Sequence, residues 1–444
     1  MEQIIRGKCV DISSEGKGII KTVYGVILVD SLLIGEEAEI KVTYSRAGIS
    51  YGKIAKLLTK SEDRIIPKCP ISTSCGGCCF QNASYEYELR YKKKKVSDAL
   101  TKIGHINYPV NDVIGMKEPE YYRNKIQIPF QRIGKNIVYG FYKANTHKII
   151  PIKSCNIEDS RSEKILKDIQ FLMSEMRIEP YNEDNRSGVI RHVLIRTSYH
   201  YDEVMVVLVT NVDSFPSRNN FVKELVKRNK LIVTIIQNIN SRDTNVILGE
   251  KERILYGKGY IKDEILSLKF HISSKSFFQV NPIQTEVLYK LAIEGLNLNK
   301  NDTLLDAYSG VGTIGLIASK YVKNVTSVEL VKSASDNARE NARNNNIKNI
   351  EIINADCTEY IEENLPYFSA VILDPPRKGT SERFLKALLK IKPKKIAYIS
   401  CDPATLARDL TYLINDYEIS LVQPVDMFPR SFHVETVVGL YLKK

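Results

Sequence analysis

The sequence of 444 residues is long enough for about two or three domains, and its hydrophobic content of 43% is ordinary for a globular protein. Its apolar stretches are much shorter than the ~20 residues that cross a bilayer, and the opening MEQIIRGKCVDISSEG has no apolar signal-peptide core. We therefore expect a soluble, cytoplasmic protein with no membrane partner.

Positive charge is concentrated in one part of the chain. The net charge is +12, and residues 51–150 alone hold 18 Lys and Arg against 8 Asp and Glu, a surplus of 10. Such a local surplus favours a polyanionic partner, RNA or DNA above all, although a solvated basic face would carry the same charge. Nothing in the sequence indicates an obligate protein partner, so we expect a monomer.

Residues 1–59 have the pattern of five short strands separated by turns, in segments such as IIRGKCVDIS, GVILVDSLL and EEAEIKVTYS. So many short strands in so short a segment are typical of a small β-barrel of the oligonucleotide-binding type. Barrels of this type bind RNA, but they also serve as plain interaction modules, and the sequence leaves both roles open.

A cysteine-rich loop follows the predicted barrel. Cys69, Cys75 and Cys78 have C-x5-C-x2-C spacing, and the two glycines before Cys78 allow the tight backbone that two thiolates on one metal centre require. Four thiolates are the usual ligands of structural zinc or of an iron–sulfur cluster, and the spacing does not separate the two. Cys155 is the best candidate for the fourth ligand because it lies in the same half of the chain, whereas Cys79 would point away and is interpreted as packing.

Residues 60–265 are predicted to form a central α+β domain that binds RNA and carries the cysteine loop. A charged helix at about 83–104 contains the run KKKK, and strand-like segments such as NKIQIPFQR, EVMVVLVTN and KLIVTIIQNIN fill most of 121–260. Arg123 and Lys125 in YYRNK are candidate phosphate contacts, although isolated basic residues could equally be solvated.

Strands and helices alternate over residues 266–444, from DTLLDAYSG and TIGLIASKYV to KKIAYISCD and PATLARDLTYLI. This alternation predicts a doubly wound, mostly parallel sheet of the Rossmann-like type, with helices on both faces. The last two strand-like segments, YEISLVQPVDMFP and ETVVGLYLKK, have no helix between them and suggest an antiparallel pair that closes the sheet. The whole chain is thus predicted to be a multidomain α/β protein.

A glycine-rich loop follows the first of these strands. GVGTIG at 310–315 matches G-x-G-x-x-G, and Glu329 ends the next strand, so the loop could hold a dinucleotide or S-adenosylmethionine. Asp306 and Tyr308 lead into the loop and favour S-adenosylmethionine, because an acidic group would face its amino end and would repel a pyrophosphate. Asp374 ends the fourth strand in DPPR, a type of motif that methyltransferases place beside a target base.

Cys401 closes an apolar run in YISCDPATLARDL, and on its own it could be core packing or a nucleophile. Ligands of open α/β sheets bind at the carboxyl ends of the strands, where five polar side chains would lie: Asp306, Glu329, Asp356, Asp374 and Cys401. The helix predicted directly after Cys401 would bring its N-terminus to the thiol, and Arg377 and Lys378 lie at a neighbouring strand end. Both features favour a thiolate.

Together these motifs resemble the RNA uracil-5-methyltransferase family, in particular bacterial enzymes that make 5-methyluridine in 23S ribosomal RNA. The resemblance covers nearly the whole chain, from a TRAM-like barrel and the C-x5-C-G-G-C loop to the motifs YYRNKIQIPF, SFFQVNP, LDAYSGVGTIGL, VILDPPRKG, YISCDPATLARDL and FHVETV. It implies methylation of uridine carbon 5 in RNA, with 23S ribosomal RNA as the expected substrate. The alternatives are a uridine in the T-loop of tRNA, a cytosine-5 methyltransferase, and a non-catalytic RNA-binding protein with a degenerate methyltransferase domain.

The resemblance also implies roles for individual residues. It implies that Cys401 is the nucleophile and Glu435 the base, although sequence alone would not exclude a surface carboxylate at Glu435. It implies a helix near 83–104 that packs on the methyltransferase domain. The implied contacts to S-adenosylmethionine are Gln279, Tyr308, Glu329 and Asp374. The implied ligands of a 4Fe-4S cluster are Cys69, Cys75, Cys78 and Cys155.

Two positions depart from the family pattern. Ser309 follows Tyr308 where the family usually has Cys, and Asp402 follows the nucleophile where it usually has Asn. A carboxylate that faced the thiol would raise the pKa of that thiol, but we expect Asp402 to cap the next helix instead. Phe277, Phe278 and Tyr308 are candidate surfaces for stacking a flipped base, although Phe at such positions is more often core.

Overall fold

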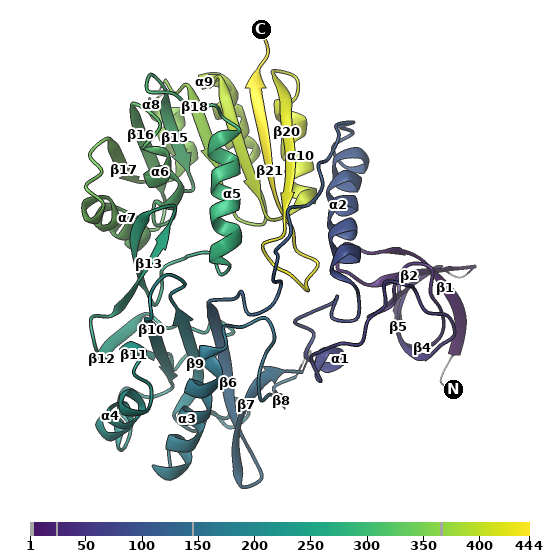
Figure 1. Ribbon diagram of the computed structural model, residues 1–444, viewed down its shortest axis with the longest axis vertical. Coiled ribbons are helices and arrows are strands. Elements are labelled where there is room, and N and C mark those ends of the chain that lie inside the picture. The colour runs from purple at the N-terminus through teal and green to yellow at the C-terminus, as the bar shows by residue number, and fades with distance from the viewer. Residues whose placement is uncertain (1–3, 24, 144–145, 365–366) are drawn as a thin grey trace.

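The computed structural model describes residues 4–23, 25–143, 146–364 and 367–444. Figure 1 shows three bodies: a barrel, a central sheet with helices on one side, and a C-terminal sheet between two layers of helices. Residues 1–3, at the start of the predicted barrel, lie outside the described residues. Of the helices within those ranges, none is both long enough and apolar enough to cross a bilayer.

The N-terminal body is a closed barrel with the strand order β1-β2-β3-β5-β4, which confirms the five-stranded barrel predicted from the sequence. Its strands are β1 (Ile4–Ile12), β2 (Gly18–Thr22), β3 (Gly25–Val29), β4 (Glu37–Arg46) and β5 (Ile49–Leu57). Alternate side chains point inward and bury Cys9, Ile20 and Ile40. Position 18 requires glycine, because a Cβ there would lie 2.6 Å from the carbonyl oxygen of Leu32.

The central body is a seven-stranded sheet with the order β12-β11-β10-β9-β6-β7-β8. Its strands are β6 (Lys125–Ile133), β7 (Asn136–Tyr142), β8 (Ile149–Pro151), β9 (Ile190–Thr197), β10 (Val204–Thr210), β11 (Ile232–Ile239) and β12 (Lys251–Tyr256). The helices α3 (Arg161–Glu175) and α4 (Arg218–Arg228) cover one face and share its apolar core. The strands β9 and β10 are buried on both faces, because their other side packs on the hairpin described next.

The hairpin of β13 (Tyr260–Ile265) and β14 (Leu268–Ser273) joins the central and C-terminal bodies. Ile261 and Phe270 of this hairpin share one core with Val207 of β10 and with Leu288 of α5 (Pro282–Glu294). The boundary predicted between residues 265 and 266 thus falls inside the turn of the hairpin, so no flexible linker separates the two bodies there.

The C-terminal body is a seven-stranded sheet with the order β17-β16-β15-β18-β19-β21-β20, in which β21 is antiparallel to both of its neighbours and the other neighbouring strands are parallel. Its strands are β15 (Thr303–Ala307), β16 (Asn324–Glu329), β17 (Ile350–Asn354), β18 (Ala370–Leu373), β19 (Lys395–Ser400), β20 (Tyr417–Val425) and β21 (Glu435–Leu442). One face carries α5, α6 (Thr313–Ala318) and α7 (Lys332–Asn344), and the other carries α8 (Cys357–Asn364), α9 (Glu382–Ile391) and α10 (Pro403–Leu413). The doubly wound sheet and the antiparallel closing pair are as predicted.

Helix α2 (Tyr85–Lys102) lies between the barrel and the C-terminal sheet (Figure 1) and follows the short α1 (Ser72–Cys75) of the cysteine loop. Ser84 caps its N-terminus by accepting a hydrogen bond from the backbone N–H of Tyr87 at 3.2 Å. Its C-terminal half packs on α10 through Val96 and Leu100. Its N-terminal half packs on the barrel, and it therefore holds two bodies together.

Candidate active site

A cavity of about 860 Å³ opens at the carboxyl ends of β15, β16, β18 and β19. All six side chains that were expected to act on cofactor or substrate border it: Gln279, Tyr308, Glu329, Asp374, Cys401 and Glu435. The parallel strands bring four of them together, because their carboxyl ends share one edge of the sheet. Glu435 begins the antiparallel strand β21 at the same edge, and Gln279 lies just before α5.

The glycine-rich loop after β15 forms one wall of the cavity. Tyr308, Gly310 and Gly312 have φ values of 62°, 56° and 79°, so the chain turns sharply through the left-handed region. Position 315 must be glycine, because a Cβ there would lie 2.5 Å from Oδ2 of Asp306. The tight loop leaves its backbone close to any ligand in the cavity.

Asp306 is not where the sequence argument put it. Its carboxylate turns back into the fold, where Oδ2 accepts hydrogen bonds from the Gly315 N–H and the Ser327 hydroxyl, each at 3.0 Å. Asp306 is only 1% exposed and does not border the cavity. It therefore shapes the loop, and the prediction that it faces the amino end of a ligand was wrong.

Glu329, at the end of β16, presents a fixed carboxylate to the cavity. Its Oε2 accepts from the Gly310 N–H at 2.9 Å, and its Oε1 accepts from the Val331 N–H at 2.7 Å. Each oxygen keeps further lone pairs that can accept bonds from a ligand. A pair of neighbouring hydroxyl groups, such as those of a ribose, would fit this arrangement.

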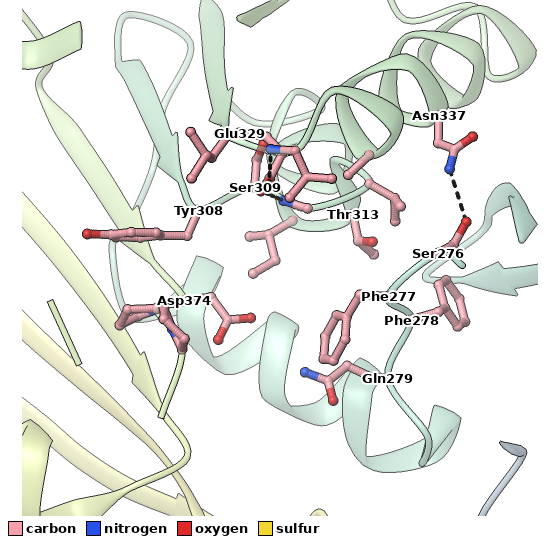
Figure 2. A pocket seen from close by; sticks show the side chains of 18 of the residues that line it. Ser276, Phe277, Phe278, Gln279, Tyr308, Ser309, Thr313, Glu329, Asn337 and Asp374 are labelled. Atoms are coloured by element: carbon pink, nitrogen blue, oxygen red, sulfur yellow. Dashed lines mark hydrogen bonds between the residues drawn. The ribbon is translucent and has the colours of Figure 1, made fainter. Parts of the chain in front are cut away.

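Asp374 lies at the end of β18 on the opposite side of the cavity from Glu329, and Figure 2 shows Gln279 facing the same space. Burial raises the pKa of Asp374 to about 7. No described Lys, Arg or His forms an ion pair with this carboxylate, so it fits a positively charged ligand. Tyr289 of α5, which had not been predicted as a site residue, borders the same cavity as Gln279.

Cys401 and Glu435 lie next to each other across two neighbouring strands. Ser400 of β19 pairs with Thr436 of β21, so the residue after β19 meets the first residue of β21. Burial, and then the nearby Glu435, raise the pKa of Cys401 to about 12. Burial, and then the charge of Asp374, raise the pKa of Glu435 to about 8. Both groups are therefore protonated in the free protein at neutral pH.

Asp402 caps α10, as expected. Its Oδ1 accepts from the backbone N–H groups of Ala404 at 2.9 Å and Thr405 at 3.1 Å, and Pro403 occupies the first turn. Its charge is the weakest of the influences that raise the pKa of Cys401. The position that had suggested a degenerate domain is therefore occupied by a functional helix cap.

Arg377 and His433 stand at the mouth of the cavity. The side chain of Arg377 is exposed, and its Nη2 lies 3.5 Å from Nε2 of His433. Burial and the Arg377 charge lower the pKa of His433 to about 4, so its imidazole is neutral. His433 had not been predicted as a site residue. Its position in FHVETV, two residues before Glu435 at the start of β21, is the sequence feature that could have indicated it.

The three aromatic residues predicted as stacking surfaces all border the cavity, but they differ in how much of each ring is exposed. Phe277 is 71% exposed, and Figure 2 shows its ring beside Gln279 at the edge of the cavity. Phe278 borders the cavity but is buried and packs against Phe270, which agrees with the core alternative, and its role in stacking stays a prediction. The ring of Tyr308 borders the cavity on one side and packs against Phe384, with ring centroids 5.4 Å apart, on the other.

The thiols of Cys69, Cys75, Cys78 and Cys155 lie in one neighbourhood. Burial raises the pKa of Cys78 to about 11, and the nearby Cys75 and Cys69 add to this rise. Burial likewise raises the pKa of Cys155 to about 12, with further contributions from Glu158 and Cys78. Over the described parts of the chain, no three His, Cys, Asp or Glu side chains converge closely enough to hold a single metal ion.

Three other predicted residues lie near this neighbourhood. Cys79 packs against the barrel, where a Cβ at position 16 would lie 2.8 Å from its sulfur. Arg123 forms a β-bridge with Glu158 and donates to the carbonyl of Lys125 at 3.1 Å. Lys125 is half-buried, which lowers its pKa to about 8. The role of the last two as phosphate contacts stays a prediction.

Comparison with known proteins gives a consistent picture. The sequence pattern of the tRNA (uracil-5-)-methyltransferase family matches residues 84–444. An uncharacterized RNA methyltransferase of Clostridium tetani is 41% identical over 96% of this chain and 93% of its own length. Another, of Halalkalibacterium halodurans, is 39% identical over 98% of this chain and 96% of its own.

A solved structure extends the similarity to the fold. The crystal structure of Pyrococcus abyssi tRNA (uracil-54, C5)-methyltransferase in complex with S-adenosyl-L-homocysteine matches with a TM-score of 0.80 and 28% sequence identity, over 98% of this chain and 100% of that chain. Barrel, central sheet and C-terminal sheet are therefore all part of the shared architecture.

Proposed function

Because the chain belongs to the tRNA (uracil-5-)-methyltransferase family and is an S-adenosylmethionine-dependent RNA methyltransferase, we propose that it methylates carbon 5 of a uridine through a covalent bond between Cys401 and the base. The observation that carries this proposal is the position of Cys401 beside Glu435, at the strand end where both border the cavity.

Four side chains would bind S-adenosylmethionine, which supplies an electrophilic methyl group on a sulfonium. Glu329 would accept hydrogen bonds from the ribose hydroxyls, since two backbone N–H groups already orient its carboxylate. Asp374 would face the positive charge, since no described Lys, Arg or His forms an ion pair with it. Tyr308 and Gln279 would complete the walls of the site.

Cys401 would act first, because carbon 5 of uracil is a weak nucleophile. As a thiolate it would add to carbon 6, and the resulting enolate would carry electron density at carbon 5, where the methyl group is accepted. The pKa of about 12 means that this thiol has to lose its proton when the substrates bind, and this proton, like that of Glu435, would pass to water in the open cavity before the reaction. Arg377 lowers this pKa and would stabilise the thiolate.

Glu435 would act last. After the methyl group is transferred, carbon 5 still carries a proton, which must leave before the bond to Cys401 can break. A carboxylate with a pKa of about 8 has a high proton affinity and can still ionise near neutral pH, which suits it to accept that proton.

The proposal is tested by trapping. RNA that contains 5-fluorouridine should remain covalently bound to the wild type, because fluorine cannot leave carbon 5 as a cation. Cys401→Ala should form no adduct and transfer no methyl group, whereas Cys357→Ala, which removes another thiol at the same cavity, should still form the adduct. Methyl transfer by Cys401→Ala would rule out the covalent route.

For the substrate, we favour 23S ribosomal RNA because the sequence motifs and the cysteine spacing resemble those of the rRNA enzymes; the barrel does not distinguish the two substrates, since the Pyrococcus abyssi tRNA enzyme shares it. A uridine of tRNA is the second candidate, since the Pyrococcus abyssi protein that it matches in fold is a tRNA (uracil-54, C5)-methyltransferase. Mass-spectrometric mapping of 5-methyluridine in rRNA and tRNA, from cells with and without this protein, decides between them.

We further propose that Cys69, Cys75, Cys78 and Cys155 hold a 4Fe-4S cluster. The four thiols influence one another's pKa but do not converge as the ligands of one zinc ion would. A four-iron cluster is larger than a single ion, so its sulfur ligands stand further apart, which agrees better with this arrangement. When bound, its positive iron atoms would stabilise the thiolates that burial disfavours.

A further inference from the structure

A second cavity, of about 510 Å³, lies next to the first. It is enclosed by the barrel loop around Ser14, by the C-terminal half of α2, and by the N-terminus of α10. Arg377, Cys401 and His433 border both cavities. The second cavity therefore also reaches the thiol of Cys401, and none of the four residues proposed to bind the cofactor borders it.

The four lysines of the run KKKK serve different purposes. Lys92 is fully buried, and Lys93 pairs with the exposed Asp112 at 2.8 Å, away from the cavity. Lys94 and Lys95 border the second cavity, together with Lys102 two turns further along α2. Successive helix residues point about 100° apart, so only part of such a run can face one surface.

The second cavity keeps positive charge available for a ligand. Lys94 pairs with Asp11 at 3.2 Å and with Asp98 at 2.5 Å, and Lys102 pairs with the same Asp98 at 3.0 Å. Two lysines thus share Asp98 in an exposed cluster, where ion pairs are weak and easily exchanged for a phosphate. Asp402, which also borders this cavity, is already bonded to the first turn of α10.

The same cavity offers aromatic surface. Phe432 and His433 form a tilted pair with ring centroids 4.2 Å apart, and both border the cavity. The ammonium group of Lys95 lies 5.0 Å from the Phe432 ring centroid and donates to the carbonyls of Ser14 and Phe432 at 2.8 and 2.9 Å. Aromatic faces flanked by lysines are the combination that holds single-stranded nucleotides.

We propose that the second cavity binds the nucleotide next to the target uridine in the RNA strand, with its base against Phe432 and its backbone at Lys94 and Lys102. This inference rests on the proposed function, because the target base must stand at Cys401. The phosphate that joins the two nucleotides would then pass Arg377 and His433, the residues shared by both cavities. The enzyme thereby recognises one neighbour of its target as well as the target itself.

The charge contribution is tested by equilibrium binding of a fluorescein-labelled RNA, AAAAUAAAA, measured by fluorescence anisotropy without a methyl donor. The double variant Lys94→Gln/Lys102→Gln should bind several-fold more weakly, and the slope of log Kd against log salt should fall by roughly 1.4, about 0.7 for each lost phosphate contact. Lys93→Gln, the matched control on the same helix, should bind as the wild type does. Lys102→Gln alone, which breaks only the pair with Asp98, should give about half the change in slope.

The base contribution is tested with abasic sites. Removal of the base on one side of the uridine should weaken wild-type binding about tenfold, and the same removal should cost Phe432→Leu little. Calorimetric binding of S-adenosylhomocysteine reports whether each variant keeps its fold. Unchanged binding by the lysine variants, or an equal loss from the abasic site in Phe432→Leu, would overturn the inference. Loss of 5-fluorouridine trapping alongside the expected binding pattern would instead overturn the proposed function.

Discussion

Glu435 is buried, whereas its proposed role as a base requires its carboxyl group to ionise. Its pKa is raised from 4.5 to about 8, so between these values the folded protein binds a proton that the unfolded chain has released. Its contribution to stability is therefore fully present below pH 4.5 and is lost as the pH rises through about 8. Glu435→Gln, which stays neutral, should thus gain stability relative to the wild type as the pH rises.

This gain is measurable. Between pH 5 and pH 8 the difference in free energy of unfolding between Glu435→Gln and wild type should grow by up to about 1.4 kcal/mol per pH unit, as measured by urea denaturation. A pH-independent difference for Glu435→Gln would contradict the raised pKa.

Asp402 provides a second test at a single residue. Asp402→Asn should keep the helix cap and remove the charge, so the unfolding free energy should change little and iodoacetamide should alkylate Cys401 somewhat faster. Asp402→Ala should also remove the charge but lose the cap, at a cost of about 1 kcal/mol. Peptide mass spectrometry gives the alkylation rate at this thiol, and equal stability of the two variants would show that the cap is unimportant.

At this scale the sequence predicted well where a motif fixes a strand end. Glu329, Asp374 and Cys401 could be placed at one edge of the sheet from the alternation of strands and helices alone. Asp306 and Phe278 could not, because the pattern does not show whether a side chain turns to the ligand or to the fold. Asp306 turns into the fold because the Gly315 N–H needs a hydrogen-bond acceptor. Phe278 turns into the fold because it packs on Phe270 in the apolar core.

At the scale of elements, α2 depends on a buried ion network. The Nζ atom of Lys92 lies 2.6 Å from both Glu88 and Asp426, and it also donates to the carbonyl of Phe428 at 3.2 Å. All three charged side chains of the network are fully buried. Lys92 thereby fastens α2 to the segment between β20 and β21, which leads to Glu435.

Lys92→Met should therefore be strongly destabilising, because it leaves two buried carboxylates without their cation. The expected loss is about 3–5 kcal/mol in the free energy of unfolding. Lys93→Met, which breaks only the exposed pair with Asp112, should cost less than about 1 kcal/mol. Chemical denaturation of the two variants checks the contrast, and adding Glu88→Gln to Lys92→Met should recover part of the loss. Similar effects of the two single substitutions would argue against the network.

The element that was hardest to anticipate is the hairpin β13–β14. Its turn places Leu266 at φ 48° and Ser267 at φ 65°, a conformation for which Asn-Gly or Asp-Gly is the usual sequence signal. Since neither signal is present, the sequence could not show that the chain turns back there. Likewise, the run KKKK indicated a basic patch, although its first lysine is buried; only the packing on both sides of α2 reveals this.

At the scale of the whole molecule, the cysteine loop is connected to the catalytic end. The backbone N–H groups of Cys79 and Phe80 donate to the carbonyl of Arg430 at 2.9 and 3.2 Å. The hydroxyl of Tyr122 donates to the carbonyl of Pro429 at 3.0 Å. A loop ordered by four bound thiolates would therefore also support the segment that carries Glu435.

Anaerobically purified protein should accordingly contain about four iron atoms per chain. Cys78→Ser should lower this content sharply and lower the Tm, because metal binding stabilises only the folded loop. Cys79→Ala is the matched control: it removes the adjacent thiol, which packs on the barrel, and should keep its iron. Elemental analysis that found zinc and no iron would exclude the cluster.

The strand order β19-β21-β20 has a consequence for biosynthesis. β20 is synthesised before β21, yet β21 lies between β19 and β20 in the sheet. β20 therefore cannot pair in the sheet until β21 has been synthesised and has paired with β19. A nascent chain that ends at β20 has an unpaired edge on β19 and lacks Glu435, which is the first residue of β21. With the role proposed for Glu435, a product that is cut short before β21 could not complete turnover, and its unpaired edge on β19 would favour aggregation.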